Sequence, residues 1–227
     1  MAFPVVNGAG YSEEIVDTTT HDVVVPTGIV SGELLLLLIV LDGIPTLSGM
    51  PSGWTQLIRQ AVDTSLVSEV WYRTANATEA NFTYTSSASE RSVNRCLRIG
   101  SWHGTTIPEA AAATGIDGAN PDPPNLDPAG WGTEDTLWVA FCGNDDPVSA
   151  YPTSYTDNQF TDNTGTTFSD ANIAMATRNL AAAAEDPGTF TQSPVGNWVG
   201  ITVAVRPAAA AAPAENYPVM WALFRRR

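Results

Sequence analysis

Glu33-Leu34-Leu35-Leu36-Leu37-Leu38-Ile39-Val40-Leu41 contains the longest apolar run of this chain, from Leu34 to Leu41. A strand with one solvated face alternates polar and apolar residues, and this stretch does not alternate. It therefore predicts a strand that is covered on both sides. Two coverings are open at this point: the second sheet together with a loop of the same chain, or a neighbouring subunit.

Short β-rich segments lie on both sides of this run, separated by Gly, Pro, Asn and Asp clusters. Such spacing is typical of sandwiches and jelly rolls, and no segment has a convincing helical period. We expect one all-β domain over residues 1–206, a single antiparallel, jelly-roll-like β-sandwich. The expected strands are 14–18, 22–25, 33–41, 55–62, 67–74, 81–86, 92–102, 136–142, 171–177, 188–191 and 198–205.

Two long stretches are interpreted as loops. Residues 104–133 contain Ala110 to Ala113 and a Pro-rich segment, which is too much Pro and too little periodicity for a central strand. Residues 144–170 are rich in Thr, Asn, Asp and Tyr, with only Phe160 and Phe168 as large apolar anchors. Because long loops in a compact domain usually have a function, both are candidates for partner contacts.

The chain changes character after Arg206-Pro207. Residues 207–216 form a low-complexity Ala/Pro segment that we interpret as a linker. Residues 217–227, the C-terminal arm, are strongly apolar and end in three Arg, so we expect the arm to dock on a partner rather than stay in water. The expected partner-binding residues are Tyr217, Val219, Met220, Trp221, Leu223, Phe224, Arg225, Arg226 and Arg227.

The charge balance restricts the partners. The chain has 24 acidic residues against 10 Arg and no Lys. Without the three terminal Arg, 7 Arg against 24 acidic residues give the rest of the chain a net charge of −17. Because such a surface repels polyanions, we expect no nucleic-acid binding. The terminal Arg triplet instead suits the acidic body of an adjacent copy.

The compartment can also be inferred. Residues 1–8 lack a charged segment followed by an apolar stretch, so we expect no secretory signal and synthesis in the cytoplasm. The run from Leu34 to Leu41 is far shorter than the roughly 20 residues that span a bilayer, so no membrane segment is expected. Cys96 and Cys142 lie in apolar strand-like runs, which favours buried free thiols over a disulfide.

Catalytic patterns are absent from the sequence. His21 and His103 stand outside any nucleophile, base or metal arrangement, and we interpret both as ordinary strand-end residues. The chain has no nucleophile elbow, zinc-protease helix or phosphate loop. A glycosidase needs only two carboxylates, but Glu134-Asp135 and Glu185-Asp186 fit equally well as turns that start strands. We therefore expect no enzyme and no cofactor.

Acidic residues in the second loop raise the question of calcium, which takes oxygen ligands. Their spacing does not match the EF-hand loop, so a solvated acidic surface is the preferred interpretation and no metal site is predicted. The residues concerned are Asp145, Asp146, Asp157, Asp162 and Asp170.

Seven Trp suggest either a large core or a sugar-stacking platform. Trp71, Trp102, Trp138 and Trp198 lie within expected strands and are assigned to the core. Trp54 and Trp131 follow Gly at loop ends, where the ring either closes a turn against the core or stacks on a ligand. Core closure is preferred, and the alternative is a glycan-binding surface made of Trp54, Trp131, Tyr151 and Tyr155.

The order of several segments resembles a recurring module of structural proteins of tailed bacteriophages. The resemblance covers about residues 22–207 and leaves the arm outside. Its motifs are architectural: in Pro51-Ser52-Gly53-Trp54-Thr55, Gly53 permits a positive φ and Trp54 re-enters the core. The other segments that carry it are Val25 to Leu36, Trp71 to Arg73, Asp135 to Val139, Glu185 to Thr191 and Trp198 to Pro207.

The resemblance implies a location in a virion, after synthesis in the host cytoplasm, and supplies no catalytic residues. The leading hypothesis is a noncatalytic virion structural protein, a capsid decoration or head-fibre protein attached through its arm to other virion proteins and to its own copies. The alternative is a tail-associated module that binds host glycans. A closed homo-oligomer such as a trimer would suit a decoration or fibre protein.

Overall fold

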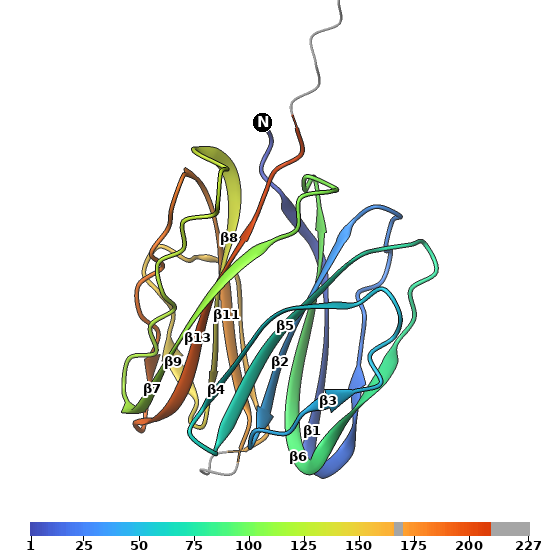
Figure 1. Ribbon diagram of the computed structural model, residues 1–227. Helices are drawn as coiled ribbons and strands as arrows, with labels where there is room; N and C mark the ends of the chain where they lie inside the picture. The colour runs from blue at the N-terminus through green and yellow to red at the C-terminus, as the bar shows by residue number, and fades with distance from the viewer. Residues whose placement is uncertain (166–169, 210–227) are drawn as a thin grey trace, which may run out of the picture.

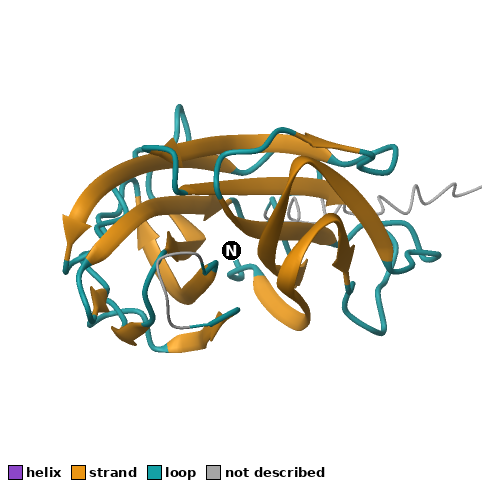
Figure 2. Cartoon of the chain, turned by 90° about the horizontal axis from the view of Figure 1, so that it is seen from below, coloured by secondary structure: helices purple, strands orange, loops and turns teal. Residues whose placement is uncertain are grey.

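The computed structural model describes residues 1–165 and 170–209, and it contains two β-sheets stacked face to face (Figure 1). Every strand pair is antiparallel. Figure 2 shows only strands and loops among these residues. The predicted single antiparallel β-sandwich is confirmed, whereas the arm residues, Tyr217 to Arg227, lie outside the described residues.

The first half of the chain forms one sheet and the second half forms the other. The first sheet has the order β1 (Val5–Val23), β6 (Phe82–Gly100), β2 (Leu34–Asp42), β5 (Leu66–Thr74), β4 (Thr55–Val62), with β3 (Leu47–Ser48) paired to β6. The second has the order β10 (Asp157–Asn163), β11 (Asn172–Ala182), β8 (Glu134–Asn144), β13 (Gly196–Val205), β7 (Glu109–Gly118). A small third sheet joins β9 (Val148–Ala150) to β12 (Thr191–Gln192).

The apolar run of β2 is covered on both faces by the same chain. Leu34, Leu36, Leu38 and Val40 pack between the sheets, in one cluster with Phe141 and Ile201 of the second sheet. The alternate residues, Leu35, Leu37, Ile39 and Leu41, lie in an outer cluster with Trp54 and Tyr84. All eight side chains have no exposed area, so the face around Leu34 to Leu41 is not a subunit contact, and that interpretation is wrong.

The outer cover over β2 comes from long strands that bend. β1 pairs with β6 along its length, but the register shifts between Glu14 and Thr18, where β1 has extra residues. Such bulges bend a strand. The far ends of both strands, with Val23 and Tyr84, therefore turn back onto the outer face of their own sheet. The sequence analysis predicted four separate short strands, 14–18, 22–25, 81–86 and 92–102, where the structure has the two long strands β1 and β6.

The turn before β4 has the predicted form. Gly53 has a φ of +94°, and the Trp54 amide donates to the Pro51 carbonyl over 3.3 Å. A residue with a Cβ would be strained at this φ. Trp54 is only 8% exposed and packs against Phe82, which closes the turn against the outer cluster.

The outer face of the second sheet is also covered by loops of the chain. Trp138 and Cys142 of β8 pack there with Trp131, Tyr155 and Phe190 from the connecting segments. Both outer faces of the sandwich are thus closed by its own residues. Cys96 and Cys142 are free and buried, as predicted.

Two stretches predicted as loops contain strands. β7 lies within residues 104–133, and β9 and β10 lie within residues 144–170. β7 and β10 are the edge strands of the second sheet, built mainly from Ala and from polar residues respectively. Neither composition has a strong intrinsic preference for strands, so their pairing is decided by neighbours distant in sequence.

Candidate functional site

The chain reaches its C-terminal segment from a fixed point at one end of the sandwich. After β13, the His103 amide donates to the Arg206 carbonyl and the Ala208 amide donates to the Ser101 carbonyl, each over 2.9 Å. Trp102 and Pro207 form an antiparallel bridge between these two bonds. The segment that precedes the arm is therefore held like a short extra strand.

Side chains reinforce this attachment, which we call the exit pole: residues 101–103 and 206–208 with the start of β8. Arg206 donates from Nε to Glu134 Oε2 over 2.7 Å, and its guanidinium lies 5.7 Å from the Trp131 ring centroid. This pairing lowers the pKa of Glu134 and raises that of Arg206. The Met1 ammonium lies 2.9 Å from Asp135, so the N-terminus is at the same pole (Figure 1).

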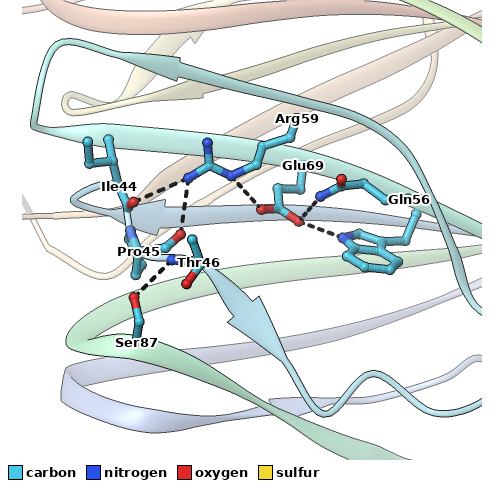
Figure 3. A network of polar contacts seen from close by, with 8 residues as sticks. Ile44, Pro45, Thr46, Gln56, Arg59, Glu69 and Ser87 are labelled. Carbon is cyan, nitrogen blue, oxygen red and sulfur yellow. Dashed lines mark hydrogen bonds and ion pairs between the residues drawn. The ribbon is translucent and has the colours of Figure 1, made fainter.

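A second feature is a polar hollow on the outer face of the first sheet, centred on Glu69 of β5 (Figure 3). Glu69 is 1% exposed and accepts hydrogen bonds from Gln56 Nε2 at 2.8 Å, Arg59 Nε at 3.0 Å and Trp71 Nε1 at 2.7 Å. The buried carboxylate is thus paired with one cation and held by two further donors. A buried charge needs such compensation.

The same arginine ties a loop to the sheet. Arg59 Nη2 donates to the Ile44 and Pro45 carbonyls at 3.2 Å and 3.1 Å, and the Thr46 amide donates to Ser87 Oγ at 3.0 Å (Figure 3). The segment that leads into β3 therefore forms a fixed rim. The resulting hollow has a volume of about 250 Å³ and is lined by Thr46, Leu47, Gln56, Arg59, Glu69 and Trp71.

Sequence reasoning missed this hollow. One signal was present: Glu69 interrupts the apolar sequence of β5, and an acidic residue in such a position is rarely buried without a partner. Its partners are Gln56 and Arg59 of β4 and Trp71 of β5. The positions of the two β4 residues follow from strand pairing that no local sequence pattern specifies.

The acidic residues of 144–170 do not form one solvated surface. Asp145, Asp146 and Asp170 are each at most 2% exposed, whereas Asp157 is exposed and Asp162 is half-buried on β10. The preferred interpretation is therefore wrong for the first three. Burial, together with the nearby carboxylates of Asp42 and Asp146, raises the pKa of Asp145 to about 7. Within residues 1–165 and 170–209, no group of three or more His, Cys, Asp or Glu is arranged to hold a metal ion.

The four residues of the alternative glycan surface do not form an exposed platform. Trp54, Trp131 and Tyr155 are 8%, 7% and 0% exposed, and Tyr151 is half-buried with its ring 6.0 Å from that of Phe190. The preferred role of both Trp rings in closing the core is confirmed. A sugar has no open ring face to stack on at the three buried residues.

The histidines differ from each other. His21 lies within β1 rather than at a strand end, and it is buried between Ser92 Oγ, 2.9 Å from Nδ1, and Ser86 Oγ, 2.8 Å from Nε2. Desolvation lowers its pKa to about 4, so the ring is neutral at pH 7. His103 follows β6 and accepts a hydrogen bond from the Thr106 amide on Nδ1.

Both candidate carboxylate pairs contain a glutamate that is paired with arginine. Glu185 is buried, lies 2.8 Å from Arg178 Nη1 and bridges Leu126 through its backbone. Glu134 is held by Arg206 at the exit pole. These contacts give each glutamate a structural role.

Comparison with protein-family models, curated proteins and solved structures finds no match for this chain. The part of the chain that the structure describes contains no helix long and apolar enough to cross a membrane.

Proposed function

We propose that the protein is a noncatalytic structural protein of a bacteriophage virion, a capsid decoration or head-fibre protein that attaches through its C-terminal arm. The observation that carries the proposal is the exit pole. The backbone bonds of Arg206 and Ala208 deliver the arm from one end of a closed sandwich, and the N-terminus lies at that end too. A body held there projects its opposite end away from the attachment point.

The closed body favours the arm as the attachment element. The bent ends of β1 and β6 cover the outer side of β2, and connecting segments cover the outer side of β8. The large apolar side chains of β2 are all buried. The arm offers Trp221, Leu223 and Phe224 with three Arg, against an acidic remainder. Tethering by the linker raises the effective concentration of these residues at a docking site.

The virion location rests on the resemblance to structural proteins of tailed bacteriophages. The turn of Pro51 to Trp54, which belongs to that resemblance, has the conformation its architecture requires, with a positive φ at Gly53. The acidic remainder of the chain agrees with a protein that assembles on a particle without binding the genome.

The test is incorporation into particles. In virions that carry the full chain, changing Trp221, Leu223 and Phe224 together to Ser should remove the protein from purified particles, because the arm loses its apolar side chains. The matched control changes Ile15 and Val16 to Ser, since these residues are 57% and 64% exposed and lie at the end of the sheet away from the exit pole. Particles that retain the arm variant at wild-type amounts would contradict the proposal.

A further inference from the structure

We propose that the polar hollow around Glu69 binds a neutral saccharide. The hollow lies on the outer face of the first sheet and is distinct from the four residues of the earlier glycan-binding alternative. The inference goes beyond the arm-mediated assembly and does not depend on it. It rests on three properties of the hollow: fixed side chains, unused hydrogen-bonding groups and balanced charge.

The side chains that would contact the sugar are fixed before binding. Glu69 holds Gln56, Arg59 and Trp71 through three hydrogen bonds of 2.7 to 3.0 Å. The Trp71 indole is therefore locked in one orientation by its own N–H. A rigid aromatic ring beside positioned polar groups loses little conformational entropy when a ligand binds.

Three polar groups around the hollow are left without a hydrogen bond among the described residues: Arg59 Nη1, the Gln56 side-chain oxygen and the Thr46 hydroxyl. In Figure 3 no dashed line reaches Arg59 Nη1 or the Gln56 oxygen, whereas the other two guanidinium nitrogens of Arg59 and the Gln56 amide nitrogen form hydrogen bonds. They offer one donor, one acceptor and one group that does both. Sugar hydroxyls donate and accept, so adjacent hydroxyls can satisfy all three.

The charge of the hollow favours a neutral ligand. The Arg59 guanidinium and the Glu69 carboxylate are paired, so the cation is already neutralised. The whole chain carries a net charge of −14, which repels anionic polysaccharides. Arg59 therefore acts as a hydrogen-bond donor rather than as a site for a sugar acid.

The size of the hollow limits the ligand. Its volume of about 250 Å³ lies just below the range of about 300–1,000 Å³ for sites of drug-sized ligands. One sugar ring fits this space, with the rest of a longer chain extending into solvent. Half-buried Trp71 supplies the apolar surface for the C–H face of that ring.

The experiment uses the full chain and saturation-transfer NMR with glucose, galactose, mannose and N-acetylglucosamine, each titrated to tens of millimolar. At least one sugar should show saturable binding. Gln56→Ala and Thr46→Val should each weaken it about threefold to tenfold, the usual effect of one lost hydrogen bond. Both side chains are exposed, and Gln56→Ala leaves the Glu69 carboxylate its bonds to Arg59 and Trp71, so we expect both variants to fold. Trp71→Ala should abolish the signal.

The matched control is Gln60→Ala on the same strand. Gln60 binds the neighbouring Ala61 carbonyl and does not line the hollow, so its variant should bind like the wild type. The absence of saturable binding by all four sugars would overturn the proposal. Binding that Gln56→Ala and Thr46→Val leave unchanged would also overturn it, because the sugar would then occupy another site. Neither result would bear on attachment through the arm, because none of the residues changed here belongs to it.

Discussion

Replacing Leu37 by Ala tests whether the outer cover of β2 belongs to the folded chain. Leu37 has no exposed area and packs in the outer cluster, whereas its neighbour Leu38 packs between the sheets. If the chain alone covers both faces, each truncation removes buried methyl groups and leaves a cavity. Leu→Ala changes at such positions cost about 2–5 kcal/mol. We therefore expect Leu37→Ala and Leu38→Ala to destabilise the protein to a similar extent.

The measurement is denaturant unfolding followed by fluorescence, at a protein concentration where sedimentation shows one species. Both variants should lower the midpoint without changing the slope of free energy against denaturant. Ile15→Ala is the control, because Ile15 is 57% exposed and surface changes usually stay within about 0.5 kcal/mol. A loss below about 1 kcal/mol for Leu37→Ala, beside a full loss for Leu38→Ala, would refute the two-sided cover.

Two further predictions concern buried groups. The pKa of Asp145 is about 7 in the folded chain, above its ordinary value of 3.8, so between these pH values the folded chain holds a proton that the unfolded chain has lost. The free energy of unfolding therefore falls as pH rises from about 4 to about 7. Asp145→Asn should remove that slope and stabilise the protein at pH 8 by on the order of 4 kcal/mol, and unfolding curves with the wild-type pH dependence would contradict this. Gly115→Ala would place a Cβ 2.4 Å from Trp198 Cε2, so the ring must move. We expect a loss of about 1–3 kcal/mol and a changed Trp emission, and a variant as stable as the wild type would show that β7 does not pack there.

The sequence predicted the strands whose own side chains decide them. The expected range 55–62 coincides with β4, and the run from Leu34 predicted β2 within one residue at each end. Large apolar and β-branched residues carry a local signal of this kind. The Ala-rich β7 and the polar β10 carry none, because their structure depends on backbone pairing with β13 and β11.

The covering of β2 and the polar hollow depend on contacts between distant segments. The unbroken apolar run predicted two covered faces, but it could not distinguish a neighbouring subunit from the bent ends of β1 and β6. For the hollow, Glu69 alone indicated a buried charge. Its partners Gln56 and Arg59 are ten or more residues away, and they reach the same face of β4 because a bulge lies between Gln56 and Ile58.

The attachment role of the arm can be measured as the mass in solution of the full chain and of a chain ending at Ala209. The shortened chain keeps both sheets and the bonds of the exit pole. If the arm ties copies of the protein together, the full chain forms a defined oligomer and the shortened chain is a monomer. An oligomer of the same size in both cases would show that the contacts between copies lie on the body and not on the arm.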